Sequence, residues 1–74
     1  MVTKQLDTTN LQLSSAILKI AAKMVTMQKG DMLEVVGLSL TFTNYVQEWC
    51  ERLNKEFTFH LDSENNTVKC HIHI

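Results

Sequence analysis

The chain has 74 residues, of which 45% are hydrophobic and 20% are charged, and its formal net charge is −1. This length fits one domain, and the composition excludes an intrinsically disordered segment, which would have fewer apolar residues and more net charge. The seven Lys and Arg residues form no basic run. We therefore expect no nucleic-acid binding, because that function usually needs a basic stripe to neutralise phosphates.

The sequence also lacks the usual signs of secretion and membrane insertion. The first apolar-rich stretch begins near Leu11 and is interrupted by polar residues, and no stretch approaches the ~20 apolar residues of a membrane span. The two cysteines, Cys50 and Cys70, are too few for a disulfide scaffold. We expect a soluble cytoplasmic protein with reduced thiols and no membrane association.

The first part of the chain predicts a strand and then a helix. Residues 3–8 fit a short edge strand around Leu6. A helix then starts at Ser14 or Ser15, whose hydroxyl would cap the first turn, and stops before Gly30. Its apolar residues recur at helical spacing: Ile17, Leu18, Ile20, Ala21, Met24 and Val25.

The middle of the chain predicts a second strand and a second helix. In a strand over residues 31–38, Leu33 and Val35 share one face. The other face takes Met32, Glu34 and Val36. A helix over residues 42–54, with Thr41 as its N-cap, has an amphipathic pattern made by Phe42, Tyr45, Val46, Trp49, Cys50 and Leu53.

The last segment predicts a β-hairpin. Apolar and polar residues alternate over residues 57–61 and again over residues 68–74. Pairing Leu61 with Val68 puts all of the apolar residues on one face, and a slip of one residue would expose them. The same pairing places Cys70 near Phe59.

The predicted order is strand, helix, strand, helix, strand, strand. Both strands of the hairpin have one apolar face, as in a sheet covered on one side. We therefore expect an α/β (α+β) fold, a two-layer sandwich in which two helices cover one face of a four-stranded mixed sheet. A single domain would span residues 1–74.

Three stretches resemble the TusA/SirA-like (YedF-like) sulfur-carrier family: LDTTNLQLSSAILK from Leu6, KGDMLEVV from Lys29 and VQEWCERLNKEF from Val46. Members of that family have a Leu-Asp segment that leads into Gly-Leu-x-Cys-Pro-x-Pro at the first helix. A Pro-Gly-Asp/Glu turn, a Leu-Glu-Val-type strand and often an aromatic-Cys pair follow. The likeness runs without gaps from about Leu6 to Phe57, and the family's fold has the same order of elements.

The chain departs from this family at the residue that carries sulfur. The resemblance aligns the family's cysteine with Leu13 and its two prolines with Ser14 and Ala16. A sulfur carrier needs a thiolate, which the N-terminus of a helix stabilises. Leu13 has no lone pair and no ionisable proton, so the family's transfer reaction cannot run from this position.

The resemblance without the cysteine implies a non-catalytic protein-binding or regulatory module in a sulfur-relay or redox pathway. We expect protein partners from such a pathway, no cofactor and no enzymatic activity. Because the second strand and the hairpin expose a face without helices, a docking surface is predicted there, made of Met32, Glu34, Val36, His60 and His71.

Two alternatives stay open. Cys50 could carry sulfur or transfer thiols, since some members of the family have a cysteine there, but both Cys50 and Cys70 also fit small core residues. His60, His71 and His73 point to the same face, with His60 diagonally across from His71. They could bind zinc or copper weakly, or form a solvated polar face.

Overall fold

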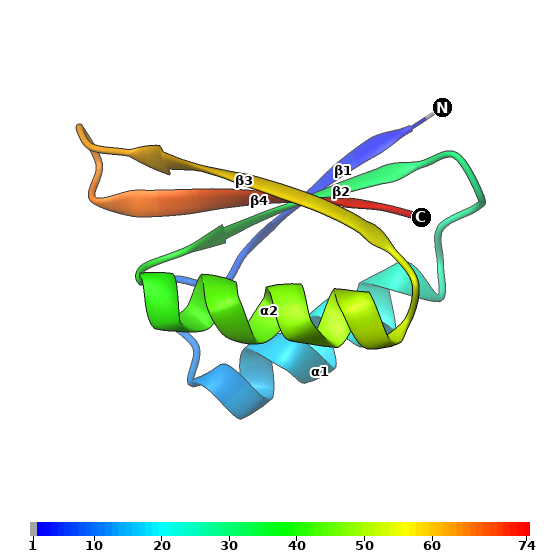
Figure 1. Ribbon diagram of the computed structural model, residues 1–74, viewed down its shortest axis with the longest axis horizontal. Helices are drawn as coiled ribbons and strands as arrows, with labels where there is room; N and C mark the ends of the chain where they lie inside the picture. The colour runs from blue at the N-terminus through cyan, green and yellow to red at the C-terminus, as the bar shows by residue number, and fades with distance from the viewer. Residues whose placement is uncertain (1) are drawn as a thin grey trace.

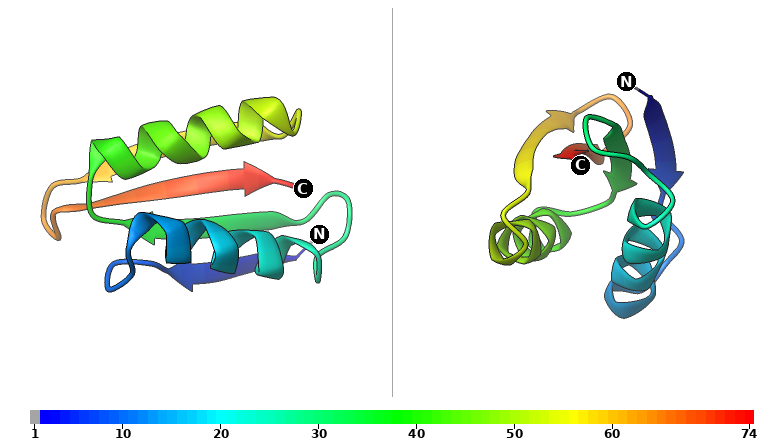
Figure 2. Two further views of the ribbon diagram at one scale, coloured as in Figure 1. Left: turned by 90° about the horizontal axis from the view of Figure 1, so that it is seen from below. Right: turned by 90° about the vertical axis from the view of Figure 1, so that its right-hand side faces the viewer.

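Two helices cover one face of a four-stranded mixed sheet, as the sequence predicts (Figure 1). The computed structural model describes residues 2–74. The strands are β1 (Thr3–Asp7), β2 (Met32–Gly37), β3 (Glu56–Asp62) and β4 (Thr67–His73), and the helices are α1 (Leu13–Met24) and α2 (Leu40–Arg52). Both helices lie on the same side of the sheet, and the opposite face is open (Figure 2).

The sheet has the order β1-β2-β4-β3. β1 runs parallel to β2, whereas β4 is antiparallel to both β2 and β3. The hairpin has the predicted register, with Leu61 opposite Val68 and Phe59 opposite Cys70. The alternation of apolar and polar residues excludes a slip of one residue, which would turn the apolar side chains away from the helices.

A single apolar core fills the space between the sheet and the helices. Both helices and the two central strands β2 and β4 contribute buried side chains, and burial of each Val, Leu or Ile among them stabilises the fold by about 1.5–3 kcal/mol. The buried cluster consists of Ile20, Leu33, Val35, Val46, Cys50, Val68, Cys70 and Ile72. Among residues 2–74, no helix is long and apolar enough to cross a membrane.

The start of α1 differs from the prediction. The helix begins at Leu13, and Gln12 occupies the N-cap position without a side-chain hydrogen bond. Ser14 and Ser15 lie inside the first turn, so the prediction that one of them caps the helix is wrong. The helix begins earlier because the N–H of Ala16 already donates to the C=O of Gln12 at 2.9 Å.

The start of α2 also differs. Ser39 is the N-cap, and its hydroxyl accepts a hydrogen bond from the N–H of Phe42 at 3.2 Å. Thr41, which the sequence suggests as the cap, lies within the first turn. Hydroxyl side chains stand at both positions, and the extended backbone of Ser39 is what allows it to cap the helix.

Gly30 does not end α1, contrary to prediction. The helix stops at Met24, and Gly30 lies in the turn before β2 with φ of +96°. Its N–H donates to the C=O of Ile74 at 3.0 Å, which ties this turn to the end of β4. Leu18 and Val25, predicted on the apolar stripe, are 71% and 84% exposed, because they lie well around the helix from the buried Ile20 at about 100° per residue.

Candidate functional site

The open face of the sheet holds a row of polar contacts that crosses all four strands. Oε1 of Glu34 accepts a hydrogen bond from Nε2 of Gln5 at 2.6 Å, and Oε2 of Glu34 lies 2.9 Å from Nε2 of His71. The ring of His71 stacks on that of His60, with 5.6 Å between the ring centroids. Gln5 lies on β1, Glu34 on β2, His71 on β4 and His60 on β3. We call these four residues the open-face row.

Strand register explains why these side chains meet. Gln5 is directly opposite Glu34 in the parallel pair, and Glu34 is directly opposite His71 in the antiparallel pair. His60 pairs with Lys69, two residues from His71, so the two rings meet on the diagonal that the sequence predicts. Directly opposed and diagonal side chains on one face are close enough to interact.

The row favours a charged carboxylate at its centre. Hydrogen bonds, first from Gln5 and then from His71, lower the pKa of Glu34 from its ordinary value of 4.5, against an opposing effect of burial. The side chains of Glu34 and His71 are both 19% exposed. Glu34 is thus held as an anion in a fixed position that a partner can reach, and protonation of His71 would turn the contact into an ion pair.

The five predicted docking residues share the open face. Glu34, His60 and His71 form most of the row, whereas Met32 and Val36 flank it at the two ends of β2 and are partly exposed. Gln5 is a member of the row that was not predicted from the sequence. Its position next to Leu6 could have indicated it. Neighbouring residues of a strand point to opposite faces, so a residue beside the core-facing Leu6 points to the open face.

The three histidines do not gather into one site. His73 is the last residue of β4, opposite Met32 and Glu56, and takes no part in the contact between His60 and His71. Across residues 2–74, no three His, Cys, Asp or Glu side chains come together in a way that could hold a metal ion. Of the three histidines, His60 and His71 form a stacked pair.

Both thiols are buried in the core. Cys50 on α2 and Cys70 on β4 are free cysteines with no exposed surface. Burial raises the pKa of Cys50 to about 11, with a smaller contribution from Cys70. Burial also raises the pKa of Cys70, whose Sγ lies 4.0 Å from Oγ1 of Thr43. Thiol chemistry at Cys50 would require α2 to move away from the sheet.

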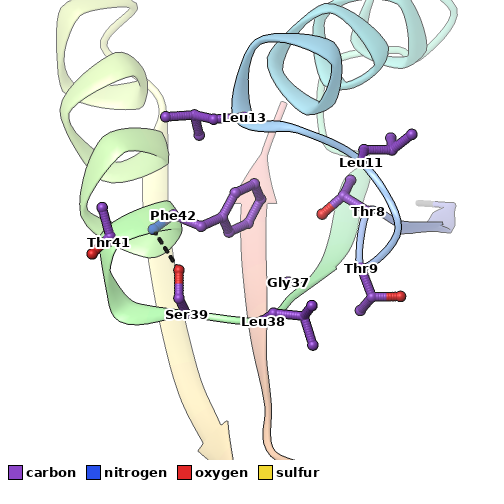
Figure 3. A pocket seen from close by; sticks show the side chains of 9 residues that line it. All are labelled: Thr8, Thr9, Leu11, Leu13, Gly37, Leu38, Ser39, Thr41 and Phe42. Atoms are coloured by element: carbon purple, nitrogen blue, oxygen red, sulfur yellow. Dashed lines mark hydrogen bonds between the residues drawn. The ribbon is translucent and has the colours of Figure 1, made fainter.

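Leu13, where the resemblance places the sulfur-carrying cysteine, borders a hollow of about 180 Å³ between the starts of α1 and α2 (Figure 3). The ring of Phe42 projects from α2 towards the start of α1. The hydroxyl of Thr8 donates to the C=O of Val36 at 2.7 Å, and that of Ser39 caps α2. None of the lining residues can titrate near neutral pH, so the hollow has neither a nucleophilic thiol nor a general base. Its lining is Thr8, Thr9, Leu11, Leu13, Gly37, Leu38, Ser39, Thr41 and Phe42.

Comparison of the chain with protein-family models, with curated proteins and with solved structures found no match.

Proposed function

We propose that the protein is a non-catalytic binding module that docks a protein partner on the open face of its sheet. The observation that carries this proposal is the open-face row, which fixes a carboxylate and two imidazoles on a face without helices. Polar groups that are already held in place lose less conformational freedom when a partner binds. Met32 and Val36 add apolar contact area on either side.

The chemistry of the remaining surface supports binding rather than catalysis. The hollow beside Leu13 has no titratable lining residue, and both thiols are buried. The open-face row has titratable groups but lines none of the hollows described in residues 2–74, whereas catalysis usually takes place in a concave pocket that excludes water.

The partner class follows from the resemblance to the TusA/SirA-like family. A chain that keeps this scaffold without the cysteine could bind the proteins of a sulfur relay and regulate transfer without carrying sulfur itself. A cysteine desulfurase, the enzyme that supplies sulfur to such relays, is therefore the first partner to test.

The experiment is an NMR titration of the isotope-labelled protein with a purified cysteine desulfurase. We expect the amide signals of Glu34, His60 and His71 to shift or broaden, while those of α1 stay in place. The variant His60→Glu changes an exposed residue of the row and should weaken binding about tenfold or more. Leu18→Glu, at a position on α1 that is also exposed, is the matched control and should bind normally.

Two results would count against the proposal in different ways. Perturbation confined to α1 and α2 would move the docking surface to the helical side. An unchanged spectrum at saturating desulfurase would remove this partner class.

A further inference from the structure

β3 forms one edge of the sheet and has a free side. In the sheet order, β4 is its one neighbour among residues 2–74. The outer row of backbone N–H and C=O groups of β3 therefore has no strand to pair with, and the strand lies along the margin of the molecule (Figure 2). Such an edge is a template for another β-strand.

β3 has few of the features by which proteins usually protect an edge, because its acidic residues, Glu56 and Asp62, stand only at its two ends. Lysine, proline, a β-bulge or a very short length commonly prevents edge-to-edge pairing. β3 has seven residues, contains neither Lys nor Pro, and pairs with β4 without interruption from Glu56 to Asp62. The opposite edge is better protected, because β1 has five residues and contains Lys4.

The same strand leaves apolar side chains partly uncovered at this margin. Phe59 and Leu61 are 42% and 61% exposed although they belong to the apolar series that faces the helices. Phe57 packs against the core, and its ring centroid lies 6.1 Å from that of Phe59. A strand added beside β3 would cover these rings and the Leu61 side chain while it pairs with the free backbone.

We propose that β3 pairs antiparallel with β3 of a second copy of this chain, to form one continuous sheet across a two-fold axis near Phe59. In this register Phe59 lies opposite its own counterpart, and Phe57 lies opposite Leu61. Every pair on the helix side is then apolar. On the open face Thr58 lies opposite His60. A strand of another protein would need the same alternation of apolar and polar residues, and β3 itself already has it. Because the two copies are related by a two-fold axis, the interface closes as a dimer.

The two ends of the paired strands limit the affinity. Glu56 lies opposite Asp62 of the second copy, and opposed like charges in a sheet are destabilising. Hydrogen bonds, with that from Asn65 the largest contribution, lower the pKa of Asp62 and keep it charged. Added salt screens this repulsion, so the dimer should become tighter as ionic strength rises.

The test is sedimentation velocity of the full chain over a wide range of concentration. We expect a monomer–dimer equilibrium that Leu61→Lys and Thr58→Lys shift towards monomer by about tenfold or more in Kd. Both residues are exposed, so the fold should survive. The control Leu18→Lys puts the same charge on an exposed apolar residue of α1 and should leave the equilibrium unchanged.

Cysteine cross-linking gives a second measurement. The native thiols are buried, so a cysteine introduced at Phe59→Cys would be the reactive one, and mild oxidation should yield a disulfide-linked dimer. The control Leu18→Cys, on α1, should not form a disulfide-linked dimer under the same conditions. A monomer at all concentrations would overturn the proposal. So would a dimer that dissociates in Leu18→Lys but persists in Leu61→Lys.

Discussion

The carboxylate of Glu34 lies 2.9 Å from Nε2 of His71, directly across the pairing of β2 and β4. This contact joins the two central strands on the face that the helices leave open. The other carboxylate oxygen of Glu34 is engaged by Gln5 of β1. One side chain therefore links three strands, and its charge should affect both the stability of the sheet and the docking surface.

Replacing Glu34 with Gln should make stability less dependent on pH. Hydrogen bonds from Gln5 and then His71 hold the pKa of Glu34 below its ordinary value of 4.5 in the folded state. The unfolded chain therefore binds a proton more readily, so the contribution of Glu34 is full above pH 4.5 and is lost as pH falls through the lower folded pKa. We expect Glu34 to contribute at most about 1 kcal/mol to the free energy of unfolding, since its contact with His71 is partly exposed.

Urea unfolding at a series of pH values measures this contribution. The difference in the free energy of unfolding between the wild type and Glu34→Gln should shrink as the solution becomes acidic. Glu56→Gln, at an exposed position of β3, serves as the control. A difference that stays constant through the acidic range would show that Glu34 acts through packing rather than charge.

Gly37 should not tolerate a side chain. A Cβ at this position would overlap the ring of Phe42 in the first turn of α2. It would lie 3.2 Å from Cγ of Phe42 and closer still to two other atoms of the ring. We expect Gly37→Ala to lower the free energy of unfolding by about 1–3 kcal/mol, the usual cost of overpacking. Thermal unfolding should show this as a lower Tm, by about 4–8 °C for each kcal/mol.

A double-mutant cycle with Phe42→Leu tests the cause. The smaller side chain of Phe42→Leu should recover part of the stability that Gly37→Ala loses. It should recover nothing in Gly30→Ala, where nothing lies within 4 Å and the cost comes from a φ of +96°. Equal recovery in both backgrounds would rule out the clash with Phe42.

The hairpin could be predicted from the sequence because its two strands have strict alternation. The observed register puts Phe59 and Leu61 on the same face as Cys70 and Val68, and a slip of one residue would expose them, so local pattern and core burial lead to the same answer. The diagonal placement of His60 and His71 follows from that register. In contrast, the contact between Gln5 and Glu34 depends on the parallel pairing of β1 with β2, which a helix-length connection sets and no local pattern reveals.

Helix starts were harder to predict, for a physical reason. Ser39 and Thr41 are both good N-cap residues, so propensity alone does not choose between them. The choice depends on tertiary structure: α2 must begin early enough to bring Phe42 against Gly37 at the end of β2. At α1 the prediction failed because Gln12, a residue without a capping bond, precedes the helix.

Ser39→Ala should destabilise the protein more than Thr41→Ala does. The hydroxyl of Ser39 accepts the bond from the N–H of Phe42, and losing an N-cap typically costs about 1 kcal/mol. Thr41 is exposed in the first turn, and its replacement should change stability by less than about 0.5 kcal/mol. Chemical denaturation of both variants measures the difference. The reverse order would mean that Thr41 caps the helix in solution.

Cys50 should be inert in the folded protein. Its side chain has no exposed surface, and burial raises its pKa to about 11, which disfavours the thiolate, the reactive form, at neutral pH. A thiol reagent should label neither Cys50 nor Cys70 in native buffer and both in denaturant. Incubation with a cysteine desulfurase and cysteine should leave the intact mass unchanged.

The variant Cys50→Ser separates the structural role of this residue from a chemical one. It places a hydroxyl in the apolar core and should cost about 1–3 kcal/mol of stability, while Cys50→Ala, which adds no polar group, tests the loss of volume alone. A gain of one sulfur atom that reductant removes and Cys50→Ser abolishes would contradict the inert thiol. It would favour sulfur transfer through α2, and it would require an opening of the helix that hydrogen exchange at the Cys50 amide should then detect.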